Sequence, residues 1–136
     1  MERTEAEDVR VLKEGEPLVL STLSKTWILD LDGTILMHNG YKLDGKDTLI
    51  EAARDYIRNI PEDDFILILT SRTEEFKDMT LSFLNENDIR YDEILFNVPM
   101  GERIIVNDRK LSGIDMAVAV NIDRDIWNVP RVKCEL

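Results

Sequence analysis

Residues 26–34 read TWILDLDGT, an apolar run that ends in two acids, a glycine and a threonine. Trp27-Ile28-Leu29 has the composition of a buried strand, and the polar residues behind it predict a turn. Asp30 and Asp32 are one residue apart, so the end of this strand brings both carboxylates into one small volume. Two such charges repel each other unless a cation is present, and a hard divalent ion such as Mg²⁺ suits them. The alternative is a plain acidic turn, because Asp and Gly are common in turns.

The rest of the chain alternates apolar runs with amphipathic segments. A helix is expected from Thr48 to Ile60, capped by Asp47 or Thr48 and ended by Pro61, and a second helix begins near Thr73. The predicted strands are Trp27–Leu29, Phe65–Leu69, Ile94–Phe96, Arg103–Val106 and Met116–Val120. Strands that are apolar on both faces and alternate with helices predict an α/β fold, in which helices cover a parallel sheet.

The candidates for chemistry are the polar residues that directly follow the predicted strands. In such sheets, ligands bind at the carboxyl ends of the strands, near a switch in strand order. The residues at these positions are Asp30, Asp32, Thr70, Ser71, Asn107 and Asp108. Hydroxyl and backbone N–H groups at the helix start after residue 69 can hold phosphate oxygens. A helix-capping role explains Thr70 equally well.

The string Asp30-Leu31-Asp32-Gly33-Thr34, placed after a buried strand, resembles the first signature of the haloacid dehalogenase (HAD) superfamily of phosphotransferases. The resemblance covers residues 26 to about 121. It implies a Rossmann-like three-layer α/β sandwich whose parallel sheet has the strand order 5-4-1-2-3. A flap and one helix occupy residues 33–65, and one helix and one strand occupy residues 71–102, so no cap domain is expected.

The resemblance also implies roles for the matching acids. Asp30 would attack phosphorus and bind Mg²⁺. Asp32 would protonate the leaving alcohol, then activate water, and its carbonyl would bind the metal. Asp108, after the fourth predicted strand, would be the third metal ligand. The chemistry is sound in itself, because a carboxylate can act as a nucleophile and a second acid beside it can move protons.

Thr70, Ser71 and Arg72 match the second signature of the family. They would bind the phosphate group of the substrate, with Thr70 as the family's phosphate ligand. For Arg72, an exposed structural role is an equal alternative.

The family's site lysine usually precedes the fourth strand, and this chain has only Arg90 and Arg103 in that stretch. Lys110, which follows Asp108 closely, is the candidate that we choose instead. A cation beyond the metal is needed, because several negative groups surround one phosphate. A surface position for Lys110 is the alternative.

Composition restricts the class of protein further. The chain has 136 residues and a formal net charge of −11, with one cysteine and one histidine. This length fits one domain, which we place at residues 26–136, after an N-terminal arm or extra strand at residues 1–25. The acidic balance disfavours a nucleic-acid partner. Neither a signal peptide nor an apolar run long enough to span a bilayer is seen, so a cytoplasmic protein is expected.

The leading hypothesis is a magnesium-dependent phosphatase that acts on a small phosphorylated metabolite, such as a sugar phosphate. The resemblance also implies a homo-oligomer, a dimer or tetramer, because capless relatives often assemble. One alternative is a polynucleotide-end phosphatase, which the acidic charge opposes. Another is a non-catalytic phosphate-binding protein like a receiver domain. In a receiver, however, the phosphorylated Asp follows the third strand, and here the paired acids follow the first.

Overall fold

The computed structural model describes residues 15–43 and 45–136. The described residues form two compact units, one of residues 24–127 and a smaller one of residues 15–23 and 128–136. In the smaller unit, strand β1 (Leu18–Leu20) pairs in parallel with β5 (Val132–Cys134). A strand is therefore present before residue 26, whereas residues 1–14 of the expected N-terminal arm lie outside the described residues. The last nine residues, which we had placed in the main domain, belong to the smaller unit.

The larger unit is built on three parallel strands, β2 (Thr26–Asp30), β3 (Phe65–Leu69) and β4 (Glu93–Leu95). Their order is β2-β3-β4, and the strand ends Asp30, Leu69 and Leu95 lie in register across the sheet. The first three predicted strands are thus confirmed, and they form the small parallel α/β sheet expected of this class. The carboxyl ends of all three strands meet at one edge.

Two helices follow the strands as the apolar spacing predicts. Helix α3 covers Glu51–Arg58, and α4 covers Lys77–Glu86 after a 3-10 turn, η1 (Glu74–Phe76). The flap between β2 and α3 contains a short helix, α2 (Gly40–Leu43). The predicted cap is wrong, because Ile50 occupies the N-cap of α3 and no side chain bonds to its free N–H groups.

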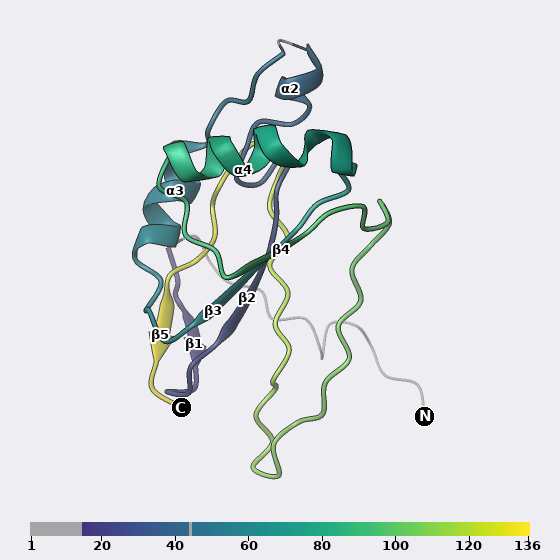
Figure 1. The fold of residues 1–136 in the computed structure, drawn as a ribbon. Helices are drawn as coiled ribbons and strands as arrows, with labels where there is room; N and C mark the ends of the chain where they lie inside the picture. Colours follow the sequence, from purple (N-terminus) through teal and green to yellow (C-terminus); the bar gives the residue numbers. More distant parts are fainter. Residues whose placement is uncertain (1–14, 44) are drawn as a thin grey trace. The chain divides into compact units, whose positions relative to one another are not determined.

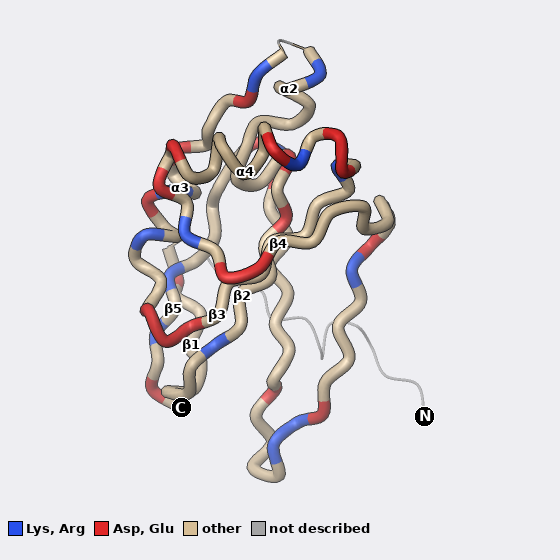
Figure 2. Tube along the Cα trace, in the orientation of Figure 1, with Lys and Arg blue, Asp and Glu red and all other residues tan. Residues whose placement is uncertain are grey.

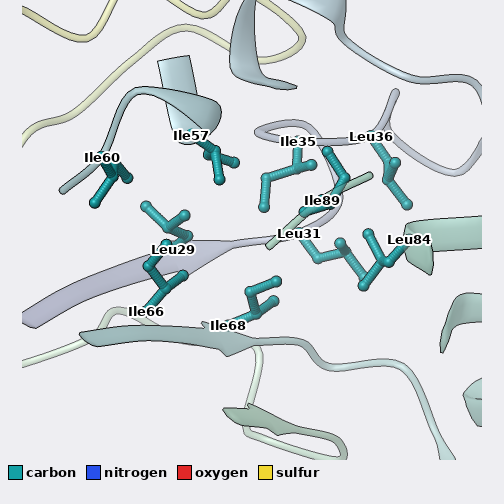
Figure 3. Close-up of a cluster of buried hydrophobic side chains, with 10 residues drawn as sticks. All are labelled: Leu29, Leu31, Ile35, Leu36, Ile57, Ile60, Ile66, Ile68, Leu84 and Ile89. Carbon is teal, nitrogen blue, oxygen red and sulfur yellow. The ribbon is translucent and has the colours of Figure 1, made fainter. Parts of the chain in front are cut away.

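The core lies on one face of this sheet. Figure 3 shows Ile57 from α3 and Leu84 from α4 pointing toward the same cluster as Ile66 and Ile68 from β3. The cluster consists of buried aliphatic side chains: Leu29, Leu31, Ile35, Leu36, Ile57, Ile60, Ile66, Ile68, Leu84 and Ile89. Because side chains alternate along a strand, the residues between these core positions point to the opposite face.

That opposite face is open in the described structure. Ile28, Phe65 and Leu95 lie on it, and each is exposed. Both α3 and α4 contribute to the core on the other side. The larger unit therefore shows one helical layer against its sheet, and the expected third layer is not seen in the described part of the unit.

The segment 103–120, which we call the arm, differs most from expectation. It was predicted to hold the fourth and fifth strands, Arg103–Val106 and Met116–Val120, but the structure assigns no strand to either. Figure 1 shows the arm as a long green excursion that runs opposite to β2 and then turns back. Lys110 and Gly113 form its far turn, where Lys110 N–H donates to Ile114 O and Gly113 N–H donates to Lys110 O. Of the predicted order, the structure shows the part that corresponds to strands 1-2-3.

A search of the described helices found none with the length and apolar character needed to cross a lipid bilayer.

Candidate functional site

Asp30 ends β2, at the sheet edge where the three strands stop. Its Oδ2 accepts a hydrogen bond from the Thr34 hydroxyl at 3.0 Å, and its Oδ1 accepts one from Arg103 Nη1, also at 3.0 Å. The side chain of Asp30 is 38% exposed. Gly33 has φ +85, a conformation that few side-chain-bearing residues adopt, so it permits the turn that returns Thr34 to Asp30. The result is a carboxylate that is held in place yet reachable from solvent.

Asp32 faces a buried arginine. Arg72 Nε donates to Asp32 Oδ2 at 3.0 Å, and Arg72 Nη2 donates to Asp32 Oδ1 at 2.7 Å. Such a bidentate pair fixes both the position and the plane of the carboxylate. Asp32 is nevertheless 19% exposed at its side chain, whereas the side chain of Arg72 has no exposure. Arg72 thus supports Asp32 from the inside of the protein.

The same guanidinium holds a second carboxylate, that of Asp47. Arg72 Nη1 and Nη2 donate to Asp47 Oδ2 and Oδ1 at 3.0 and 2.7 Å, and Nη1 also donates to Thr80 Oγ1 at 2.8 Å. With the two bonds to Asp32, all five N–H groups of the guanidinium have acceptors. The plane of Arg72 also lies 3.9 Å from the centre of the Tyr41 ring. The alternative that Arg72 lies exposed is therefore wrong, whereas its contact with substrate stays a prediction; in the described structure its donors are used inside the protein.

The charge balance of this cluster favours the charged arginine. Burial lowers the pKa of Arg72, but the hydrogen bonds and the Coulomb attraction of Asp32 and Asp47 outweigh burial and raise it above its ordinary value. Two carboxylates surround one guanidinium, so the cluster keeps a net negative charge. Arg72 offsets part of the repulsion that Asp30 and Asp32 would otherwise feel.

Thr70 and Ser71 follow β3 at the same edge of the sheet. Thr70 is buried, and its Oγ1 accepts a hydrogen bond from the backbone N–H of Arg72 at 3.1 Å. Its backbone N–H donates to Leu95 O, and its carbonyl accepts from Val98, so the turn after β3 is tied to the segment after β4. Ser71 Oγ is 3.5 Å from Pro99 O. The predicted phosphate-binding hydroxyls thus follow β3 at the edge where Asp30 ends β2, and Thr70 also orients Arg72.

The arm begins and ends at this site. Arg103, its first residue, contacts Asp30. Just after its end, Asp125 N–H donates to Gly33 O, and Asp125 Oδ1 accepts from the backbone N–H of His38, both at 2.8 Å. The loop that carries the acids is therefore held between the two ends of the arm.

Two predicted site residues lie in the arm and away from these contacts. Asp108 is exposed, and the hydrogen bond that reaches its carboxylate comes from Asn107. Lys110 lies in the far turn. Within the part of the chain that the structure describes, the cation that contacts Asp30 is Arg103, not the predicted Lys110.

The donor set of one chain does not match a magnesium site. Among residues 15–43 and 45–136, no three His, Cys, Asp or Glu side chains converge in a way that could hold a metal ion. Asp30, the first predicted ligand, contacts Arg103, whereas the contacts of Asp32 with Arg72 involve its carboxylate and not its backbone carbonyl, which is the predicted ligand. Asp108, the third predicted ligand, does not join them. Mg²⁺ takes six oxygen ligands, several of which are usually waters, and in the described single chain Asp108 does not converge with the other acids to share such an ion.

Comparison of the chain with protein-family models, curated proteins and solved structures found no match. The case for a function therefore rests on the residues described above.

Sequence reasoning missed two members of the site, Asp47 and Arg103. Asp47 precedes a helix, and that position suggested a cap; only the long-range contact with Arg72 shows its role. Arg103 carried a usable signal, because it is the first residue of the predicted fourth strand, and the family resemblance places a cation shortly before that strand.

Proposed function

We propose that this chain is a phosphatase that hydrolyses a phosphomonoester of a small metabolite, such as a sugar phosphate, on a HAD-like fold with strand order 5-4-1-2-3. The observation that carries the proposal is the pairing of an exposed carboxylate, Asp30, with a second carboxylate, Asp32, that a buried arginine orients from behind. Hydroxyl groups follow β3 at the same edge of the sheet. These features support covalent phosphoryl transfer followed by hydrolysis.

In the first step, a carboxylate oxygen of Asp30 attacks phosphorus, and the bond from phosphorus to the ester oxygen breaks. The departing alkoxide takes a proton from Asp32, and Asp30 becomes an aspartyl phosphate. Arg72 holds Asp32 through one lone pair on each oxygen, and each carboxylate oxygen can accept a further hydrogen bond. The exposed part of Asp32 therefore remains available for proton transfer.

In the second step, water attacks phosphorus, Asp32 takes its proton, and the acyl phosphate bond breaks to release inorganic phosphate and the Asp30 carboxylate. The two hydrogen bonds from Arg72 keep the position and the plane of the Asp32 carboxylate fixed through both steps. Arg103 places positive charge beside Asp30, where negative charge accumulates in both transition states. We propose a requirement for Mg²⁺ as well, although a single chain does not assemble the ligands.

The test is turnover of an aryl phosphate and of a panel of phosphorylated metabolites, with Mg²⁺ and with a chelator. Asp30→Asn removes the nucleophile but keeps the size and the acceptor for Thr34, so it should fold normally and abolish turnover. Asp55→Asn is the matched control, because Asp55 is exposed on α3, and it should keep full activity. Turnover that survives in the folded Asp30→Asn variant would reject the mechanism.

A further inference from the structure

The arm and the free edge of β2 are complementary features of the same chain. In the described sheet β2 is a terminal strand, so one side of its backbone has no neighbouring strand. An unpaired edge of this kind readily accepts another strand. The arm is rich in β-branched residues, and residues 103–106 and 116–120 read RIIV and MAVAV. Both segments have the composition of strands but pair with none in the described structure.

The arm also exposes apolar surface that a single chain leaves in water. Ile104 is 86% exposed and Val106 is 91% exposed. Figure 2 shows its two legs mostly in tan, with the charged residues gathered toward the far turn and at the start. The open sheet face next to β2 adds Ile28 and Phe65, which are also exposed. Large apolar side chains exposed at several positions of one segment are a feature of interaction surfaces.

We propose that the arm of a second copy of this chain pairs with the free edge of β2, and that the two copies exchange arms in a symmetric dimer. The direction of the arm supports this partner. In a two-fold pair that meets edge to edge, the two β2 strands run in opposite directions. The first leg of the arm, residues 103–108, runs opposite to its own β2 (Figure 1), so this leg runs parallel to β2 of the other copy. Parallel pairing continues the sheet, whose strands are all parallel.

The length of the arm fits this arrangement. The arm starts at Arg103, which contacts Asp30 at the carboxyl end of its own β2. In the pair, that end lies beside the start of the other copy's β2, which is five residues long. A leg from Arg103 that spans those five residues ends next to Asp108. Asp108 of one copy therefore reaches Asp30 of the other, so that each site contains Asp30 from one copy and Asp108 from its partner.

Charge is consistent with a second copy as the occupant. The chain as a whole is strongly acidic, but the arm carries three basic side chains, Arg103, Arg109 and Lys110, and two acidic ones. It is thus a part of the surface that can approach another acidic copy without strong repulsion. The docking of the arm stands on these observations, whereas the role given to Asp108 rests on the proposed function.

The first experiment measures the mass of the full chain by native mass spectrometry and sedimentation velocity. A dimer is expected. Val106→Asp should convert the dimer to a monomer, because it would place a charged side chain in the strand that is buried against the other copy. Met100→Asp is the matched control: Met100 has the same 91% exposure but lies outside the arm. It should leave the dimer intact, and circular dichroism should show both variants folded. A monomeric native chain, or a dimer that Val106→Asp does not weaken, would overturn the proposal.

The second experiment mixes two inactive variants, Asp30→Asn and Asp108→Asn, after exchange of subunits. If acids from two copies share a site, half of the dimers contain one intact site, and about a quarter of the native activity returns. No recovery in a confirmed mixed dimer would overturn the delivery of Asp108 across the interface. The two proposals fail separately: a dimer without turnover rejects the phosphatase, and an active monomer rejects the exchange of arms.

Discussion

At the scale of single residues, Arg72 has the most demanding environment. It lies between Asp32 and Asp47 with every guanidinium N–H bonded and with no exposed side-chain surface. A buried ion pair adds little net stability, because desolvation offsets attraction, but removal of one partner leaves an uncompensated charge. Arg72, which the sequence placed among the substrate-binding residues, instead holds Asp32, the acid next to Asp30.

We therefore expect Arg72→Met to lower the free energy of unfolding by about 3–5 kcal/mol, because Asp47 would stay buried without its cation. Arg58→Met is the control. Arg58 forms an exposed ion pair with Asp88 at 3.5 Å, so its substitution should lower the free energy of unfolding by under about 1 kcal/mol. Urea denaturation measures both values. Equal losses would contradict the role given to Arg72.

Arg103 should show the reverse pattern, a large effect on activity and a small one on stability. Its ion pair with Asp30 is partly exposed, so Arg103→Met should change the free energy of unfolding by under about 1 kcal/mol. The loss of positive charge next to the reacting phosphate should lower kcat/KM by about 100-fold. Steady-state kinetics with Arg58→Met as the control measures the effect. Unchanged kcat/KM would remove Arg103 from the site.

At the scale of elements, the side chain of Asp64 links the starts of the neighbouring strands β2 and β3. Asp64, just before β3, accepts hydrogen bonds from Trp27 Nε1 and from the backbone N–H of Lys25, both at 2.9 Å. Asp64 is itself buried. Asp64→Ala should thus lower the free energy of unfolding by about 2 kcal/mol, because the indole N–H of Trp27 would lose its acceptor. Asp63→Ala, at an exposed neighbour, should have little effect in the same denaturation experiment, and similar losses in both variants would argue against this link.

Helix α3 meets the sheet through an aromatic group. Tyr56 packs edge-on against Trp27, with ring centres 5.7 Å apart, and lies 5.3 Å from Trp127. Burial raises the pKa of Tyr56 to about 12. An unfolded tyrosine ionises near pH 10, so the unfolded state binds fewer protons between these two pKa values. Stability should be unaffected below pH 10 and should fall as pH rises from about 10 to 12.

Denaturation in this pH range, with Tyr56→Phe as the comparison, measures that contribution. The variant should show a shallower loss of stability, because phenylalanine has no hydroxyl to ionise. Tyrosinate absorbance of the native protein should show the ionisation of Tyr56 near pH 12, and this signal should be missing in Tyr56→Phe. An identical pH dependence in both proteins would contradict the burial assigned to Tyr56.

At the scale of the whole molecule, charge works against compactness. A net charge of −11 on 136 residues produces repulsion that salt screens. The melting temperature should therefore rise between low ionic strength and about 0.15 M NaCl, where the Debye length is about 8 Å. Thermal scans monitored by circular dichroism test this. Arg72→Met, scanned in parallel, should show a similar salt dependence, because the buried ion pairs that it removes should respond little to salt. A melting temperature that falls with salt would contradict a dominant role for repulsion.

Local patterns in the chain were sufficient for the strands β2, β3 and β4, the helices α3 and α4, and the paired acids after β2. Each of these follows from contacts between near neighbours: apolar periodicity, Pro61 as a stop, and Gly33 in a turn. Asp30 and Asp32 share a site simply because one residue separates them. For these features the chain needed no information from distant residues.

The partners of those acids depend on folding in three dimensions. Arg72 meets Asp32 across 40 positions, and Arg103 meets Asp30 across 73. No local periodicity records such pairs, because they form only when the strand ends come together. For the segment 103–120, too, local patterns were not sufficient. It has the composition of strands, but a strand forms only where a neighbouring strand has a free edge. Composition sets the propensity of that segment, but only the tertiary structure decides whether an edge is available to it.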